Sequence, residues 1–353
     1  MKMKRFLKMG VCLVSLLLVI GVIGSCVPVS SPTSTSITSS PISSPSSPTT
    51  KKLKIAAIYL ISAADGGFCE TLHRSLQEVA KEKGYTYEYS ENVALADAEN
   101  FIRGYAERGF DVIFAHTTGY KTAIEKVAPD YPNIVFGLFA GKTASKNVFL
   151  YDWYGNETSY LLGVLAGLMS KSELIGHIGG MKVPNQLRYL GGFEAGVQSV
   201  KPTATVKSAF TGSFSDSAAG KEVATSFINQ GMDVLFDTMG LAWIGVKDLA
   251  KQKGVYILAD YGYKTVNAPD VILAGQLVHF DKLLELVLAD WDKHSLKEEY
   301  WGSLANGICD IMYSSEADKI IPKEVFDKID LAKRAIISGE IQVPRLDLEA
   351  TSP

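Results

Sequence analysis

The sequence has few cysteines: Cys12, Cys26, Cys69 and Cys309 are the only four among 353 residues. No two of them form a CxxC pair, and none has metal-ligand spacing to a histidine, so they give no indication of a metal site. Cys12 and Cys26 belong to the N-terminal stretch, which leaves Cys69 and Cys309, far apart in the chain. We favour two buried free thiols, and a single disulfide is the alternative.

The N-terminal stretch lacks an apolar run long enough to cross a membrane as a helix. Its run from Met9 to Ile23 is shorter than the roughly 20 residues that a spanning helix needs. Basic side chains come before this run and small residues follow it, which is the pattern of a secretory signal peptide. We therefore predict a signal peptide over residues 1–25.

The signal peptide ends in Ile23-Gly24-Ser25-Cys26, which resembles the bacterial lipobox. The resemblance implies that the Cys26 thiol is acylated and that Cys26 becomes the new N-terminus; an uncleaved anchor is the alternative. Residues 26–52 are dominated by Ser, Thr and Pro and predict a disordered tether. Both interpretations place the folded part outside the cytoplasm, held at the cell membrane.

The sequence also lacks an excess of positive charge and the common catalytic motifs. Its formal net charge is -3, so there is no electrostatic reason to expect nucleic-acid binding. We find no GxSxG, HExxH, GxGxxG or GxxxxGK[ST] motif, which disfavours an enzyme and a phosphate-binding loop. We expect no cofactor and no metal ion.

From Leu53 onward, apolar runs typical of buried strands alternate with amphipathic stretches typical of helices. Residues 53–61, 110–118 and 133–139 are predicted strands, and 70–83, 98–108 and 120–128 are predicted helices. The same alternation returns after residue 156, with a helix rich in small residues over 156–172 and a late strand over 272–278. This pattern predicts an α/β protein with two doubly wound parallel-sheet lobes joined by a hinge. We expect residues 53–153 plus about 279–312 in lobe 1, and 154–278 plus the C-terminal segment in lobe 2.

Ligands of open parallel sheets bind beyond the carboxyl ends of the strands. The loops predicted at those ends are rich in aromatic, Gly, Asp and His residues, which suits a flat ligand with polar edges, such as a heteroaromatic ring. The candidate binding residues in or beside these loops are Asp65, Phe68, His116, Tyr120, Phe214, Gly240, Trp243, Asp260 and His279.

Several of these candidates also have a purely structural explanation. Phe68 could pack its own loop, His116 could satisfy loop backbone, and Trp243 could belong to a helix core. Asp260 ends an apolar strand with no helix directly after it, so the structural explanation is weakest there.

Three segments, 129–139, 160–202 and 211–236, together resemble the basic membrane protein (PnrA-like) family of ABC-transporter substrate-binding lipoproteins. The most specific of them contains GVLAGLMSK, IGHIGGMKVP and GFEAGV. The resemblance implies a periplasmic-binding-protein type I fold. It also implies delivery of a purine nucleoside or a related compound to a membrane permease and its ATPase.

The resemblance assigns roles to particular residues. Phe214, within Gly212-Ser213-Phe214-Ser215-Asp216, matches an aromatic residue that stacks on the base, and Asp260 matches an Asp that holds the sugar. The loops at 65–68 and 116–120 match first-lobe contacts.

Two departures from the family pattern concern the sugar. The first loop reads Ala64-Asp65-Gly66-Gly67-Phe68-Cys69-Glu70 in place of an Asn-Asp-x-Ser-Phe-Asn-like motif, and no Lys stands near Val278-His279. A free nucleobase or another small heteroaromatic compound is then as credible as a nucleoside. Tyr300-Trp301-Gly302 matches a subgroup whose first loop has Gly followed by a large aromatic residue.

The expected mechanism is hinge closure around the ligand, with Phe68 and Phe214 on its two faces and Asp260 and His279 at its polar edge. Two alternatives share this fold. One is a receptor that passes a signal to a membrane partner, and the other is a sugar-binding protein.

Overall fold

The computed structural model describes residues 52–141 and 145–345. The predicted signal peptide, Cys26 and nearly all of the predicted tether lie outside the described residues. Among the described helices, none combines the length and the apolar character needed to cross a membrane.

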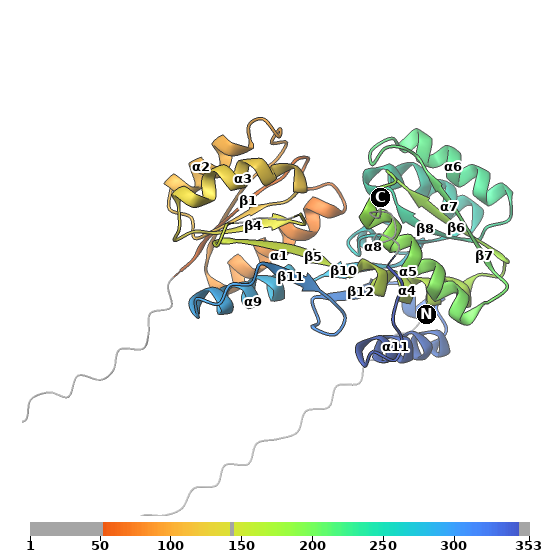
Figure 1. Cartoon of the computed structure of the whole chain (residues 1–353). Coiled ribbons are helices and arrows are strands. Elements are labelled where there is room, and N and C mark those ends of the chain that lie inside the picture. The colour runs from red at the N-terminus through yellow and green to blue at the C-terminus, as the bar shows by residue number, and fades with distance from the viewer. Residues whose placement is uncertain (1–51, 142–144, 346–353) are drawn as a thin grey trace, which may run out of the picture. The chain divides into compact units, whose positions relative to one another are not determined.

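The first of two six-stranded sheets defines lobe 1, and all its strand pairs are parallel. Its strand order is β11-β5-β4-β3-β1-β2 (Figure 1). The bounds are β1 (Lys54–Ile58), β2 (Thr86–Ser90), β3 (Val112–Ala115), β4 (Val135–Phe139), β5 (Val148–Trp153) and β11 (Glu299–Gly302).

The second sheet defines lobe 2 and has the order β12-β10-β9-β8-β6-β7. It is parallel except for β12, which pairs antiparallel with β10. The bounds are β6 (Leu174–Gly179), β7 (Thr205–Phe210), β8 (Val234–Thr238), β9 (Tyr256–Ala259), β10 (Ile272–Val278) and β12 (Cys309–Tyr313).

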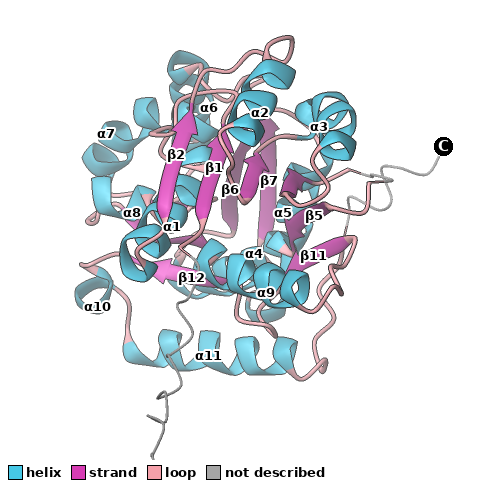
Figure 2. Cartoon of the chain, turned by 90° about the vertical axis from the view of Figure 1, so that its left-hand side faces the viewer, coloured by secondary structure: helices cyan, strands magenta, loops and turns pink. Residues whose placement is uncertain are grey.

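Helices cover both faces of each sheet, as the alternating pattern predicts. In lobe 1, one face packs against α1 (Phe68–Lys83) and α9 (Phe280–Asp292). The other packs against α2 (Ala98–Glu107) and α3 (Lys121–Val127), which is flanked by the short 3-10 helices η1 (Thr118–Tyr120) and η2 (Ala128–Asp130) (Figures 1 and 2).

In lobe 2, one face carries α4 (Gly155–Met169), α5 (Pro184–Val200) and α11 (Lys323–Ile337). The other face carries α6 (Ser217–Asn229), η3 (Gly240–Trp243) and α7 (Ile244–Lys253). Two four-residue helices, α8 (Lys264–Asn267) and α10 (Ala317–Ile320), complete the lobe.

The small residues of 156–172 allow α4 and α5 to touch backbone to backbone. A Cβ atom on Gly163 would lie 2.2 Å from the Phe193 carbonyl oxygen, and one on Gly196 would lie 2.1 Å from the Tyr160 carbonyl oxygen. Any side chain at these positions would therefore push the two helices apart.

The chain crosses between the sheets three times in the described part: after β5, after β10 and between β11 and β12. The expected lobe 1 boundary at about residue 312 needs correction, because β12 pairs with β10 in lobe 2. The pairing places Cys309 opposite Val278, so the last crossing falls in the loop after Gly302. Since this pair is antiparallel, a rule based on parallel βαβ alternation could not anticipate it.

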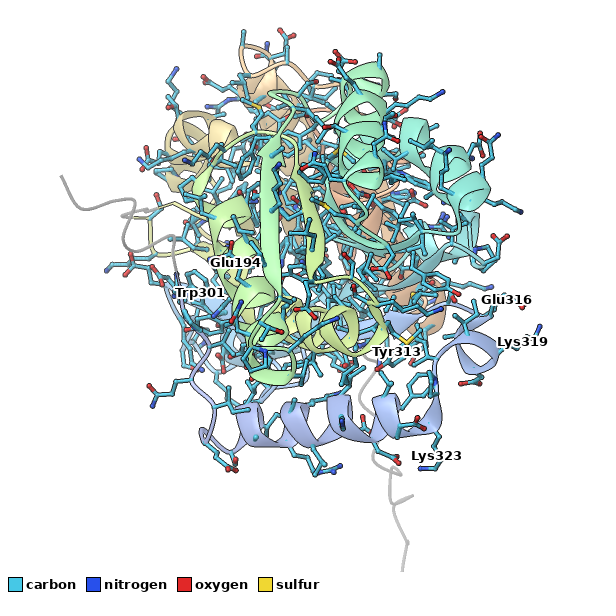
Figure 3. All side chains as sticks on the ribbon, turned by 90° about the vertical axis from the view of Figure 1, so that its right-hand side faces the viewer. Glu194, Trp301, Tyr313, Glu316, Lys319 and Lys323 are labelled. Atoms are coloured by element: carbon cyan, nitrogen blue, oxygen red, sulfur yellow. The ribbon has the colours of Figure 1, made fainter. Side chains whose placement is uncertain are left out.

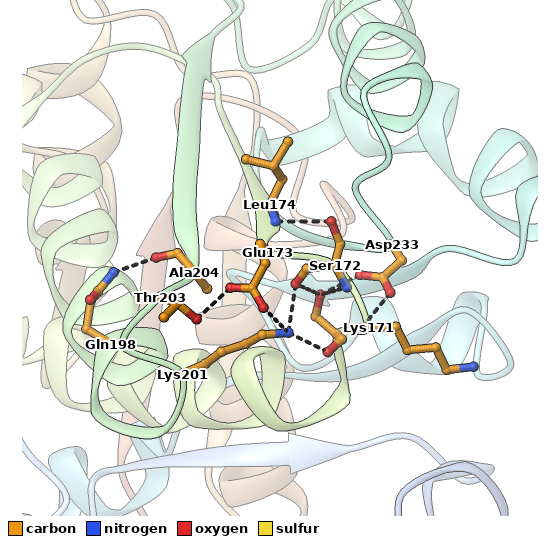
Figure 4. A network of polar contacts seen from close by, with 10 residues as sticks. Lys171, Ser172, Glu173, Leu174, Gln198, Lys201, Thr203, Ala204 and Asp233 are labelled. Carbon is orange, nitrogen blue, oxygen red and sulfur yellow. Dashed lines mark hydrogen bonds and ion pairs between the residues drawn. The ribbon is translucent and has the colours of Figure 1, made fainter.

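A polar network ties the strands of lobe 2 together near the amino ends of β6, β7 and β8 (Figure 4). Lys201 Nζ donates to the carbonyl oxygens of Ser170 and Ser172 at 3.0 and 2.8 Å. The Asp233 carboxylate accepts from Ser170 Oγ at 2.6 Å and from the Lys171 backbone N–H at 2.7 Å. The Met-Ser-Lys segment that carries the family resemblance thus has a structural role here, at the opposite end of the strands from the site.

The C-terminal helix α11 packs beneath lobe 2, below Tyr313 (Figure 3). The Tyr313 ring meets the Phe326 ring edge-on at 4.9 Å. The chain then returns toward the crossings. Asn156 Nδ2 donates to the carbonyl oxygens of Val343 and Pro344 at 3.1 and 3.2 Å.

Cys69 and Cys309 are buried free thiols, which confirms the favoured interpretation.

Candidate functional site

A cavity of about 1040 Å³ lies at the carboxyl ends of the strands of both sheets. Its lining comes from loops of lobe 1 and of lobe 2, as the strand-end rule predicts. Six of the nine candidate residues line it: Asp65, Phe68, His116, Phe214, Gly240 and Asp260.

The lobe 1 wall of the cavity is built from stacked aromatic rings. Phe68, the first residue of α1, stacks on His116 with ring centroids 3.8 Å apart and planes inclined by 14°. Phe139, at the end of β4, meets Phe68 edge-on at 4.8 Å. Phe139 and Tyr151 also line the cavity, and the sequence analysis missed both. Each stands at or near the carboxyl end of an apolar strand, and this was the signal that could have identified them.

His116 is fixed in a single neutral form. Burial lowers its pKa to about 3, although its bond to the Phe68 backbone opposes this. Its Nε2 lies 2.9 Å from the Phe68 carbonyl oxygen, which only accepts, so Nε2 carries the proton. Its Nδ1 then accepts from the Tyr151 hydroxyl at 2.7 Å. His116 therefore orients Phe68, and both of its nitrogens are used by the protein.

Asp65 lines the cavity, but its carboxylate holds the start of α1. It accepts from the backbone N–H groups of Gly67, Cys69 and Glu70 at 2.9, 3.1 and 3.0 Å. These are among the N–H groups that a helix leaves without internal partners at its N-terminus. The main work of Asp65 is thus to fix the loop that carries Phe68.

The lobe 2 wall is formed by Phe214, whose ring lies against Gly180. A Cβ atom on Gly180 would lie 2.3 Å from Phe214 Cδ1. Gly240, with a φ of +60°, brings its backbone against Phe214, where a Cβ atom would lie 2.9 Å from the Phe214 carbonyl oxygen. The Gly179-Gly180 pair, which has no phosphate-loop motif, makes room for aromatic rings.

Asp260 belongs to a buried ion triad at the end of β9. Lys264 Nζ lies 2.7 Å from carboxylate oxygens of both Asp237 and Asp260, and the Lys264 side chain is fully buried. Burial raises the pKa of Asp260 to about 7; Lys264 opposes this rise and Asp237 adds to it. The sequence analysis identified Asp260 but missed that a lysine only four residues later would be its partner.

An ion pair between the lobes also lines the cavity, and the sequence analysis missed it. Arg188 Nη2, from α5, donates to both Asp152 carboxylate oxygens, on β5, at 2.9 and 3.0 Å. The Arg188 guanidinium also lies over the Trp301 ring, 5.4 Å from its centroid. Among the described residues that line the cavity, Arg188 alone has a cationic side chain, and Asp152 neutralises it.

Three candidates do not line the cavity. Tyr120 is fully buried in the core beside α3 and donates to the Val93 carbonyl oxygen at 2.6 Å. Trp243 packs in the core between α6 and α7, the structural explanation left open for it. His279 precedes α9 at a crossing, and its backbone N–H donates to the Ile308 carbonyl oxygen at 2.7 Å.

The bond from the His279 backbone to Ile308 holds the crossing in place, with the His279 side chain at the start of α9. Apolar patterns at the ends of strands do not reveal whether a side chain turns toward a cleft or into the core beneath it. That explains why these three candidates were placed in the site.

Comparisons with known proteins bear on the family and the fold of this chain. Residues 52–347 match the model of the family described as ABC transporter substrate-binding protein PnrA-like. A purine-binding protein from Brucella abortus is 28% identical over 260 residues, covering 71% of this chain and 73% of that protein. A putative ABC transporter glucose-binding protein from Haloferax volcanii is 26% identical over 303 residues, covering 82% of this chain and 73% of that protein.

Among solved structures, a solute-binding protein of an ABC transporter system from Conexibacter woesei has the same fold. Its TM-score is 0.72 at 21% identity, and the match covers 83% of this chain and 99% of that one. The two-lobed architecture is thus the periplasmic-binding-protein type I fold. The chain belongs to the PnrA-like family of ABC-transporter substrate-binding proteins, which bind their ligands and are not enzymes.

Proposed function

We propose that this protein captures an uncharged purine, as the free base or the nucleoside, outside the cytoplasm and delivers it to an ABC importer. The observation that carries the proposal is a cavity with an aromatic wall in each lobe, Phe68 on one side and Phe214 on the other. Aromatic rings on two sides suit a flat heterocycle, because stacking is favourable for any base. The purine-binding relative from Brucella abortus supports the same ligand class.

The charges that line the cavity favour an uncharged ligand over a nucleotide. Asp152 already neutralises Arg188, and the neighbouring Asp260 carboxylate is held by buried Lys264. A phosphate group in the cavity would therefore lie close to carboxylates. Among the described lining residues, no cation that is not already neutralised would pair with it. The N-terminus of α1 cannot take the place of a cation, because its backbone N–H groups already donate to the Asp65 carboxylate.

Binding is proposed to close the two lobes about their crossings. A ligand that touches both walls favours the conformation in which the walls are close, by its difference in affinity for the two states. The closed lobes then present one continuous surface to a permease with its ATPase. The acylated Cys26 and the tether over 26–52 hold the domain at the extracytoplasmic face of the cell membrane.

A calorimetric titration of hypoxanthine, adenine, inosine, adenosine, inosine monophosphate and glucose tests the ligand class. We expect binding of at least one base or nucleoside and none of the monophosphate. Glucose is included because a relative carries a glucose-binding name. Binding of glucose without any purine would reject the proposal in favour of the sugar-binding alternative.

The anchor is tested separately, by metabolic labelling with a radioactive fatty acid in a bacterial host that processes lipoproteins. The full chain should incorporate the label, and the Cys26→Ser variant should not. Equal labelling of both would remove Cys26 as the acylation site without affecting the ligand proposal.

A further inference from the structure

We propose that Tyr261 is a positioning residue that couples ligand binding to closure of the lobes, through a contact with the Gly66-Gly67 turn. This inference deepens the proposed function, because it concerns the same cavity. Tyr261 follows β9 in lobe 2, yet its ring packs within the core cluster of lobe 1. It is nearly fully buried and also lines the cavity.

The contact between the lobes is very close. A Cβ atom on Gly67 would lie 2.7 Å from Cδ2 of the Tyr261 ring and 3.2 Å from Cε2. A Cβ atom on Gly66 would lie 3.5 Å from the indole nitrogen of Trp243, also in lobe 2. The absence of a side chain on Gly67 is what lets the turn rest on the Tyr261 ring, whereas a Cβ atom on Gly66 would make only an ordinary contact with Trp243.

Hydrogen bonds within lobe 1 hold the lobe 1 side of this contact. Asp65 accepts from the Gly67 backbone N–H at 2.9 Å, and Glu70 accepts from the Gly66 backbone N–H at 2.9 Å. The Glu70 carboxylate also accepts from Arg74 Nε at 2.6 Å. The Arg74 guanidinium in turn lies 5.2 Å from the centroid of the Tyr263 ring in lobe 2.

The lobe 2 side is anchored just as firmly. The Gly262 backbone N–H donates to the Gln276 carbonyl oxygen at 2.6 Å, and the Lys264 backbone N–H donates to the Tyr261 carbonyl oxygen at 3.2 Å. Lys264 is itself fixed by its two carboxylate partners, Asp237 and Asp260. Since both sides are rigid within their own lobes, the contact between them changes only when the lobes move relative to each other.

This arrangement gives the Asp-Gly-Gly-Phe loop two functions. Phe68 supplies a wall for the ligand, and Gly67, one residue earlier, supplies the surface on which Tyr261 rests. A ligand seated against Tyr261 and Phe68 therefore favours the same lobe arrangement that the glycine contact requires. The sequence of this loop, which differs from the nucleoside-binding motif, therefore favours closure of the lobes and also changes the ligand contacts.

The test is a double-mutant cycle with Gly67→Ala and Tyr261→Ala. Gly104→Ala is the matched control, because Gly104 is a helical glycine of lobe 1 and a Cβ atom there would have nothing within 4 Å. Affinity for hypoxanthine is measured by calorimetry, and lobe opening by small-angle X-ray scattering of the full chain with and without hypoxanthine.

We expect Gly67→Ala to weaken hypoxanthine binding roughly 10-fold, as for a methyl group forced into a packed site, and to increase the radius of gyration. Gly104→Ala should change neither. In the Tyr261→Ala background, Gly67→Ala should weaken hypoxanthine binding by less than about threefold, because the ring that the methyl group would contact is absent.

If Gly67→Ala weakens hypoxanthine binding as much in the Tyr261→Ala background as in the wild-type protein, the inference is overturned, because the methyl group would then act within lobe 1. Unchanged affinity and scattering for Gly67→Ala alone would overturn it too. If the wild-type protein binds neither hypoxanthine nor any other base or nucleoside of the calorimetric series, the proposed ligand class fails. The scattering of ligand-free Gly67→Ala against wild type still decides the inference: a larger radius of gyration supports it and an equal radius overturns it.

Discussion

Phe214 owes its position to two glycines that pack against it. Gly180 leaves room for its ring, and Gly240 leaves room for its backbone. The ring is only partly buried and faces a cavity whose opposite wall is held by His116 and Asp65. At the scale of the residue, then, much of the polar chemistry beside the cavity serves to fix aromatic surfaces.

Truncation of Phe214 tests this role. We expect Phe214→Ala to weaken binding of the purine ligand by roughly 1–3 kcal/mol, the usual cost of losing one base–aromatic stack. The matched control is Phe210→Ala, which removes a partly buried ring of the same lobe that packs on Gly179 and does not line the cavity. Calorimetry measures both, and equal losses in the two variants would remove Phe214 from the site.

The Asp152–Arg188 pair gives a second prediction at this scale. The Arg188 side chain is 3% exposed and the Asp152 side chain 10%, and burial raises the pKa of Asp152 although Arg188 opposes it. Loss of Arg188 would leave a buried carboxylate without its main partner, which typically costs about 3–5 kcal/mol. We expect Arg188→Gln to lower the free energy of unfolding, and Arg188→Gln with Asp152→Asn to recover part of it. Urea denaturation checks this; a double variant as unstable as Arg188→Gln alone would contradict it.

At the scale of the element, the close pair α4 and α5 packs on one face of the lobe 2 sheet. Since Gly196 faces the backbone of Tyr160 at a distance that excludes any side chain, the helices cannot accommodate a methyl group without separating. This explains why the resemblance to the family is carried so strongly by the glycine pattern of 160–202. Gly163 and Gly196 record a packing requirement between the two helices that lies away from the cavity.

We therefore expect Gly196→Ala to destabilise the protein by about 1–3 kcal/mol, the typical cost of overpacking. Gly104→Ala serves as the control, and it should be neutral or stabilise by up to about 1 kcal/mol, because alanine is the better helix former. Chemical denaturation measures both. A neutral Gly196→Ala would show that α4 and α5 can move apart at little cost.

At the scale of the whole molecule, buried titratable groups make stability depend on pH in opposite directions. Burial lowers the pKa of His177 to about 3, and His116 behaves alike. Unfolded histidine titrates near 6.5, so the stability that neutral histidine contributes is present above about pH 6.5 and is lost as the pH falls toward 3. Asp260 has the opposite sign, because its raised pKa makes the folded protein hold a proton that the unfolded chain releases near pH 4.

Two variants separate these contributions. We expect His177→Gln to lose less stability than wild type between pH 6.5 and 4, since it has no buried imidazole to protonate. Asp260→Asn should lose more stability than wild type over the same range, because it lacks the carboxyl group whose protonation at lower pH stabilises the folded state. Thermal unfolding at several pH values measures both slopes, and a shift of either variant in the other direction would be inconsistent with the buried positions of these side chains.

The alternation of strands and helices, the two lobes and the edge of each sheet at which the cavity lies can all be predicted from the amino-acid sequence. These features follow from local periodicity, as the agreement between predicted strand 272–278 and β10 illustrates. The sequence also predicts Phe68, Phe214 and Asp260 at the cavity, because each lies in, or at the end of, a loop that follows the carboxyl end of a strand. Hydrophobic periodicity shows which face of a helix or strand is buried, and so it locates the ends of the strands. It does not show where the side chains beyond those ends point.

Which of the side chains at those ends reach the cavity depends on the tertiary structure. Tyr120 and Trp243 turn into cores, while Arg188, near the N-terminus of α5, reaches Asp152 of the other lobe. The tertiary structure also determines that Tyr261 rests on Gly67 and that β12 belongs to lobe 2. These are contacts between segments far apart in the chain, and no local pattern encodes them, because they depend on how the two lobes meet.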